Sequence, residues 1–330
     1  MKSITLILLT SLLIYISCTN KSPHINSRNI HGFDVYIKIY GNPESGSVSN
    51  IISDAFSLIE TNIDNLIGVS GEITKLNSVG ELTNASESCL ELLDNVLRMQ
   101  SISGGAWSPF MSELNELWAL ESVSPKVPEN TALKEAILRN QSSSISISNN
   151  DNIQIIGEGK LGIKLFTLGL AMDEATQLMI DSGISSGKIE SRGITRYWGV
   201  NQIDDIWIAQ VNKPNDGDGM YNIFPDVDGA IVNIDLFRDG FRLNDTLYHR
   251  NINPKTGIPP GRPFSVTIWA DRSNLAVGFA EAALAMGEVE GRHWMAAMDE
   301  TASFFVVEFE DSYAGNADVK MSSWISTAVE

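Results

Sequence analysis

The hydrophobic pattern near the start of the chain changes from the two-residue repeat of a strand to the repeat of a helix. Residues 35–40 alternate and are rich in β-branched and aromatic side chains, which predicts a first strand. Apolar residues then recur at helical spacing from Ile51 to Leu66. This spacing predicts an amphipathic helix that ends near Gly68.

The remaining chain mixes strand and helix patterns without a regular alternation of the two. Further helices are predicted from a capping box at 88–91 to Ser101, within 161–182 with Gly183 as cap, and from Ser273 or Asn274 to Gly287. Later strands are predicted at 206–211, 230–234, 264–269 and 304–309. A serine-rich segment at 141–148 is predicted to be an exposed loop or an edge strand. This mixture indicates an α+β fold built as one compact unit.

The first 17 residues have the form of a secretory signal peptide. Lys2 precedes an apolar run at 4–16 that is too short to span a membrane comfortably, and Cys18 follows at the position of a lipobox cysteine. Tyr15 departs from the usual leucine of such boxes, and cleavage elsewhere is the alternative. We therefore predict a signal peptide at 1–17, a flexible tether at 18–30 and a domain at 31–330. The protein would be exported and held by its lipid on a bacterial membrane, facing the periplasm or the cell surface.

Composition and charge limit the classes of partner. The chain has 330 residues with 43% hydrophobic content, enough for a large core. Lys and Arg number 23 against 41 Asp and Glu, and the resulting charge of -18 excludes non-specific nucleic-acid binding. Any anionic ligand must therefore be held by local geometry. Cys89 lies in an apolar pattern and is predicted to be a buried thiol. No disulfide framework is expected, because lipidation would use Cys18, its only possible partner.

The segment 248–260 is a candidate anion site. Pro254 fixes its own φ, Asn253 can accept hydrogen bonds from the turn backbone ahead of it, and Gly257 can take a positive φ, so the turn should be rigid. Three basic residues surround it: His249, Arg250 and Lys255. Cations together with free amides attract phosphate. The alternative is an ordinary turn with solvated basic residues.

This turn resembles the His-Ile-Ile-Asp-Pro-Arg-Thr-Gly turn of the FAD:protein FMN transferase family, the ApbE group. Similar motifs occur in the same order from about Gly32 to Gly287. They lie at 71–77, 105–109 with 116–118, 162–173, 192–196, 233–236 and 275–282. The resemblance implies mixed, largely antiparallel sheets with flanking helices. It also implies an enzyme that cuts FAD and passes FMN to a threonine hydroxyl of an exported acceptor protein, with help from Mg²⁺.

The resemblance also implies roles for particular residues. Residues carried over as binding the FAD substrate are Ala106, Trp107, Ser108, Gly162, Leu168, Gly193, Arg196, Ile252 and Thr256. The candidate catalytic residues are His249 and Arg250, and the candidate metal positions are Glu281 and Leu165. Two of these have plainer alternatives. Trp107 could simply fill core, and Glu281 could be a solvated helix charge and not a relocated metal ligand.

Several motif positions depart from the family pattern. Gly162 stands where the family has Asp, Leu168 where it has Lys, Arg250 where it has His, and Val277 where it has Asp. A guanidinium stays protonated and cannot act as a base, so His249 beside it is the candidate replacement. The alternative function is a catalytically degenerate family member that serves as a flavin-binding or partner-binding lipoprotein. A purely structural lipoprotein that kept only the fold is a third reading.

Overall fold

The computed structural model describes residues 22–40, 47–120, 122, 124–148, 151–200, 207, 209–212, 220–223, 228–235, 240–243, 246–261, 265–298, 301–306 and 321–322. The predicted signal peptide and Cys18 lie outside the described residues. Within this part of the chain, no helix is both long and apolar enough to cross a membrane.

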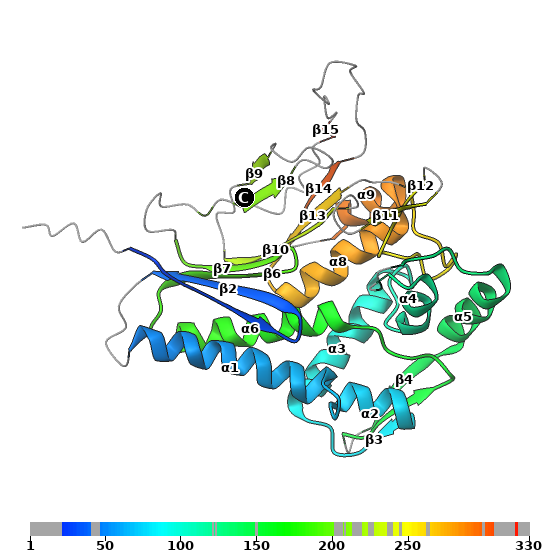
Figure 1. Cartoon of the computed structure of the whole chain (residues 1–330), viewed down its shortest axis with the longest axis horizontal. Coiled ribbons are helices and arrows are strands. Elements are labelled where there is room, and N and C mark those ends of the chain that lie inside the picture. The colour runs from blue at the N-terminus through cyan, green and yellow to red at the C-terminus, as the bar shows by residue number, and fades with distance from the viewer. Residues whose placement is uncertain are drawn as a thin grey trace, which may run out of the picture.

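An eight-stranded sheet forms the centre of the fold (Figure 1). Its strands in spatial order are β1 (His24–Ile30), β2 (Phe33–Tyr40), β6 (Ser186–Ser191), β7 (Ile194–Trp198), β10 (Gly229–Asp235), β13 (Ser265–Ala270), β14 (Ala302–Val306) and β15 (Met321–Ser322). Each of these neighbouring pairs is antiparallel. The predicted α+β class with largely antiparallel pairing is confirmed.

The helices gather on one side of this sheet, where they bury the main hydrophobic core (Figure 1). They are α1 (Val48–Ile67), α2 (Glu72–Val79), α3 (Glu87–Ile102), α4 (Ser112–Trp118), α5 (Asn130–Ser142), α6 (Lys164–Asp181), α8 (Ser273–Met286) and α9 (Glu288–Ala296). Shorter sheets complete the fold: β3 (Glu81–Leu82) with β5 (Ile153–Ile156) and β4 (Ser144–Ile147), β8 (Ala209–Asn212) with β9 (Met220–Ile223), and β11 (Gly240–Leu243) with β12 (Thr246–His249).

Helix α6 is packed between α1 and α8, and two contacts fix its position against α8. A side chain at Gly169 would approach the backbone N of Asn274 to 2.7 Å, so the two helices touch closely. Asp173 on α6 accepts hydrogen bonds from the backbone N of Ser273 at 2.9 Å, at the start of α8. The Asp173 Oδ1 also lies 3.2 Å from Nε of Arg196 on β7. This buried carboxylate therefore joins α6, α8 and the sheet.

Most predicted elements are confirmed, with small shifts at their ends. The helix ending at Gly68 and the strands at 35–40 and 230–234 are present, and the serine-rich segment supplies the edge strand β4. The predicted strands at 206–211, 264–269 and 304–309 lie partly outside the described residues.

Two predicted boundaries differ from the structure. Residues His24–Ile30 form β1, so the sheet begins inside the predicted tether; these residues look like a linker because an edge strand exposes most of its side chains. The third helix is capped by Ser86 and not by Ser88. The Ser86 Oγ accepts from the backbone N of Cys89 at 3.2 Å, while the Ser86 backbone N donates to Glu72. Cys89 is buried, as predicted.

Candidate functional site

A cavity of about 680 Å³ opens where the N-terminal end of α6 meets α2, α4, α8 and the segment that follows β12. Four residues singled out in the sequence line it: Gly162, Leu165, Arg250 and Glu281. They come from three motifs that are far apart in the chain. The fold therefore brings part of the predicted site together.

The wall around the start of α6 is held by backbone contacts. The backbone N of Gly162 donates to the Pro109 carbonyl at 2.8 Å, and a Cβ at Gly162 would lie 2.7 Å from the backbone N of Ser112. Asn77 both accepts from the backbone N of Leu161 at 2.7 Å and donates to the Leu161 carbonyl at 2.9 Å. These contacts require glycine at position 162, where the family motif has aspartate, and they fix the entry into α6.

Glu281 on α8 brings a carboxyl group to the same cavity. Its Oε2 accepts a hydrogen bond from Nε1 of Trp107 at 2.7 Å. Burial raises the pKa of Glu281 to about 7, although the Trp107 hydrogen bond favours the ionised form. Glu281 therefore differs from a freely solvated helix charge in its hydrogen bond to Trp107 and in its raised pKa. Trp107 itself is buried beside Phe166, so it fills core and also orients Glu281.

The turn after β12 is as rigid as its sequence predicts. The Asn253 Oδ1 accepts from the backbone N of Lys255 at 2.8 Å and of Thr256 at 3.2 Å, and Gly257 has a φ of 67°. Nε1 of Trp118 donates to the Gly257 carbonyl at 2.8 Å, which fastens the turn to α4. The turn thereby sets the direction in which the segment before it enters the cavity.

His249 is a buried part of this turn. Its Nε2 lies 2.7 Å from the carbonyl oxygen of Pro260, and its Nδ1 accepts from the backbone N of Asn251 at 3.1 Å. Since a carbonyl oxygen only accepts, Nε2 carries the proton and the ring is neutral. Burial lowers the pKa of His249 to about 4. Both ring nitrogens have backbone partners, so the structure gives His249 a role in fixing the turn, and it does not line the cavity.

Arg250 and Asn251, the next two residues, do line the cavity. Nδ2 of Asn251 is buried and has no hydrogen-bond partner within the part of the chain that the structure describes. A buried amide without a partner is costly, and a ligand group in the cavity could accept from it.

The other residues predicted to bind FAD lie outside the lining of this cavity. Leu168 is buried in the main core, and Ile252 packs with Trp118 in a smaller core. Thr256 lies on the exposed face of its turn. Leu168 and Ile252 therefore belong to the cores of the fold, and Thr256 lies on its surface.

Two of these positions belong to the sheet. Arg196 Nη1 donates to the carbonyls of Tyr197 and Gly229 at 2.7 Å, and Arg196 pairs with Asp173 as described above. Gly193 has a φ of 81° in the turn between β6 and β7, where a Cβ would approach the Asn233 carbonyl to 2.4 Å. Both residues hold the strands that border the cavity.

The remaining two predicted positions flank Trp107, which donates the hydrogen bond to Glu281. Ala106 is buried, and the Ser108 Oγ donates to Oδ1 of Asn140 at 2.8 Å. The Asn140 amide in turn donates to the Phe110 carbonyl at 2.9 Å. The 105–109 motif therefore ties the Trp107 turn to α5 and holds the indole that orients Glu281.

The sequence reasoning missed two basic residues of the lining, Lys164 and Arg192. Lys164 is the first residue of α6, and Arg192 precedes Gly193 in the β6–β7 turn with a φ of 51°. Both lie within segments that had been matched to family motifs. Comparing the charge at each matched position would have found them.

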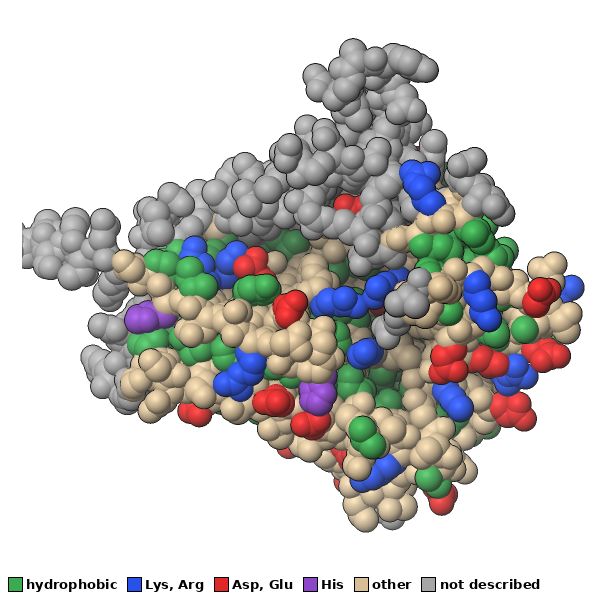
Figure 2. All heavy atoms as spheres, viewed as in Figure 1, with side chains coloured by type: hydrophobic (Ala, Val, Ile, Leu, Met, Phe, Trp, Pro, Cys, Tyr) green, Lys and Arg blue, Asp and Glu red, His purple; other side chains and the backbone are tan. Residues whose placement is uncertain are grey.

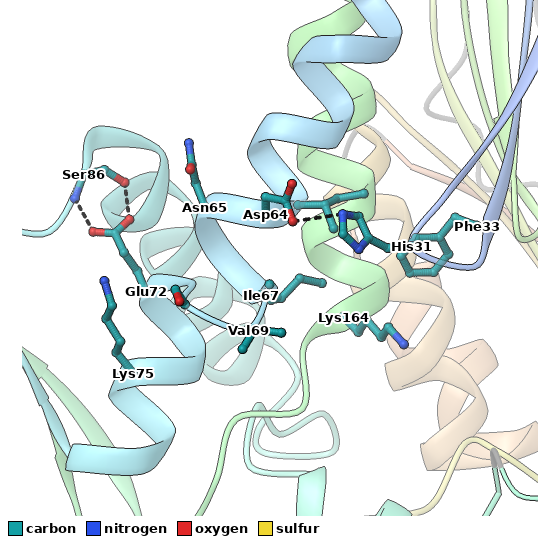
Figure 3. A pocket seen from close by; sticks show the side chains of 13 residues that line it. His31, Phe33, Asp64, Asn65, Ile67, Val69, Glu72, Lys75, Ser86 and Lys164 are labelled. Atoms are coloured by element: carbon teal, nitrogen blue, oxygen red, sulfur yellow. Dashed lines mark hydrogen bonds and ion pairs between the residues drawn. The ribbon is translucent and has the colours of Figure 1, made fainter.

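A second hollow of about 840 Å³ lies beside the first and shares Phe33, Ile67 and Lys164 with it (Figure 3). Beside Phe33, His31 Nε2 lies 3.0 Å from Asp64, and on the opposite side of the hollow Glu72 accepts from Ser86. Lys164 stands at the start of α6 next to the Phe33 ring, with its Nζ 5.5 Å from the ring centroid. The two hollows together offer room for an extended ligand.

Comparison with known proteins gives the family of the chain. The family model described as the ApbE family matches residues 31–305. The chain is 22% identical over 273 residues to an FAD:protein FMN transferase of Treponema pallidum (strain Nichols), covering 76% of this chain and 75% of that protein. It is 24% identical over 210 residues to the FAD:protein FMN transferase of Klebsiella pneumoniae (strain 342), covering 61% of this chain and 60% of that protein.

Solved structures show the same fold. The flavin transferase ApbE from Vibrio cholerae superposes with a TM-score of 0.78 at 21% identity, covering 93% of this chain and 98% of that one. The ApbE protein from Thermotoga maritima superposes with a TM-score of 0.77 at 19% identity, covering 87% and 94%. The mixed helix and antiparallel sheet architecture is therefore that of these proteins.

Proposed function

This chain belongs to the ApbE family, and we propose that it is an FAD:protein FMN transferase. The observation that carries the proposal is the cavity at the start of α6. Residues from the motifs at 162–173, 275–282 and 248–260 meet there, and the lining includes three basic side chains: Lys164, Arg192 and Arg250. The curated relatives named FAD:protein FMN transferase support the same reaction.

The proposed reaction breaks one phosphoanhydride bond and forms one phosphoester bond. The hydroxyl oxygen of an acceptor threonine attacks the phosphorus that belongs to the FMN half of FAD, and AMP leaves with the electrons of the broken P–O bond. The threonine proton passes to water or to a basic group. Arg250 can stabilise charge on the phosphate oxygens, and because a guanidinium stays protonated it takes no proton.

Mg²⁺ is the second part of the proposal, and the donor set limits how it can bind. No group of three His, Cys, Asp or Glu side chains that could hold a metal occurs in the described chain. Neither the buried Val277 nor Leu165, which lines the cavity, has a side-chain oxygen. Magnesium ions in enzymes are commonly bound by one protein carboxylate together with phosphate oxygens of the substrate and water, and Glu281 could supply that carboxylate. Bound there, the ion would offset charge on the phosphate oxygens.

A second candidate function rests on two buried side chains. Leu168 and Val277 are fully buried in the main core, at positions where the family motifs have Lys and Asp. A chain without these polar groups could bind FAD and transfer nothing. That alternative is a catalytically degenerate flavin-binding or partner-binding lipoprotein.

Export and anchoring complete the proposal. The signal-like first 17 residues and Cys18 support a lipid-anchored protein on a bacterial membrane, whose acceptor is another exported protein. Such a location would bring the cavity close to acceptors on the same side of the membrane.

Titration with FAD, with and without Mg²⁺, separates these possibilities. We expect quenching of flavin fluorescence on binding, and AMP release that requires Mg²⁺ and is lost in Glu281→Ala. Binding without AMP release would favour the degenerate binder. An absence of any binding would contradict both functions.

A further inference from the structure

Three basic side chains converge on the 680 Å³ cavity of a strongly acidic protein. Lys164, Arg192 and Arg250 line it, each from a different part of the chain, whereas the whole sequence has a charge of -18. Basic side chains gather around a hollow near the middle of the face shown in Figure 2. Two carboxyl groups, Glu116 and Glu281, also line the cavity. The basic groups still outnumber the acidic ones there, opposite to the protein as a whole.

The position of Lys164 is not explained by helix stability. It is the first residue of α6, and the N-cap residue Ile163 makes no side-chain capping hydrogen bond. A cation at a helix N-terminus is disfavoured by the helix dipole, and the first N–H groups of the helix have no acceptor inside it. An anion in the cavity would relieve both costs at once.

The two arginines are placed by rigid turns and are not used in the ion pairs of the fold. Arg192 is held by the tight β6–β7 turn, and Arg250 precedes the turn that is fastened to Trp118. Neither guanidinium has an ion pair or side-chain hydrogen bond with any residue that the structure describes. Arginine in such a position matches phosphate oxygens well, because its planar fork offers paired donors.

We infer that Lys164, Arg192 and Arg250 bind the diphosphate of FAD directly, an inference that rests on the proposed function. FAD would then bind without a metal ion. Mg²⁺ at Glu281 would then serve the transfer step and would not be needed for binding. The diphosphate is the only part of FAD that carries the matching charge, so the three side chains should discriminate FAD from riboflavin.

The test measures the affinity of the full chain, in detergent, for FAD and for riboflavin by flavin fluorescence in the presence of EDTA. Each of Lys164→Gln, Arg192→Gln and Arg250→Gln should weaken FAD binding about 10- to 100-fold, as expected for loss of one hydrogen bond to a charged group. Riboflavin affinity should stay unchanged. The matched control is Lys134→Gln, which removes the same charge from an exposed position on α5.

The outcomes separate this inference from the proposed function. The inference is supported if the wild-type chain binds FAD in EDTA and the three variants lose affinity for FAD alone. It is overturned if FAD binds only with Mg²⁺, or if the variants behave like Lys134→Gln or weaken FAD and riboflavin equally. If the wild-type chain binds no FAD under any condition, the proposed function fails and this inference fails with it.

Discussion

His249 should remain neutral in the folded protein until the pH approaches about 4. Burial lowers its pKa from the ordinary 6.5 to about 4. At about 1.4 kcal/mol per pH unit, this difference corresponds to about 3 kcal/mol. Because the folded state holds fewer protons than the unfolded state between these two values, the stability that His249 contributes is lost as the pH falls through this window.

Two measurements check this prediction. NMR titration of histidine-labelled protein from pH 7.5 to 4 resolves four side chains, and His249→Gln identifies the signal of interest. We expect that signal to stay that of the neutral, Nε2-protonated ring until the pH approaches about 4, since the Pro260 carbonyl accepts from Nε2 and burial lowers the pKa to about 4. Denaturant unfolding of the wild type and of His249→Gln should show a stability difference that shrinks by about 3 kcal/mol on acidification.

A His249 signal that titrates near 6.5 would refute the reasoning. It would mean that the ring is exposed in solution and available as a base, as the sequence alone had suggested. A stability difference between the wild type and His249→Gln that does not change with pH would refute it equally, because the burial of His249 would then have no effect on the free energy of unfolding.

Three further predictions concern the groups around the cavity. A pKa of Glu281 raised from 4.5 to about 7 makes the wild-type protein lose stability as the pH rises through that range. In denaturant unfolding, the stability of Glu281→Gln relative to the wild type should therefore rise by about 3 kcal/mol from pH 4 to pH 8; a difference that does not change with pH would contradict this. Gly162→Ala should lower the unfolding free energy by about 1–3 kcal/mol, because its Cβ would meet the Ser112 backbone, whereas Gly261→Ala, with open space around it, should not. Arg196→Met should lower the unfolding free energy by about 1.5–3 kcal/mol, because Asp173 loses its nearer arginine and keeps Ser273 and Arg272 as partners. Adding Asp173→Asn to this variant should recover part of the loss; full additivity of the two substitutions would argue against the pair.

The local elements of the fold follow directly from the sequence. The two-residue repeat at 35–40 and the helical repeat from Ile51 to Leu66 give β2 and α1, because each repeat matches the geometry of one element. The turn chemistry of Asn253 and Gly257 is likewise local, and the structure has both features as predicted. The edge strand β1 was not predicted, because its mostly polar and exposed residues have the composition of a linker.

The composition of the cavity depends on contacts between distant segments. Arg192 lies in the turn between β6 and β7, and Lys164 is the first residue of α6, so only the folded chain brings the two to one cavity. His249 was misplaced for a similar reason. Strand alternation predicts which face a side chain takes, but the carbonyl of Pro260 that captures the ring comes from packing of the whole turn.

Covalent transfer of flavin is the most direct test of the central claim. The purified chain is incubated with FAD, Mg²⁺ and membranes of the source cells that lack this protein, which supply the acceptors. Our account predicts AMP release, together with a protein band that stays fluorescent after denaturation and carries FMN on a threonine, and both signals should be lost in Glu281→Ala. Tight FAD binding with no covalent flavin and no AMP would contradict it and leave a flavin-binding protein.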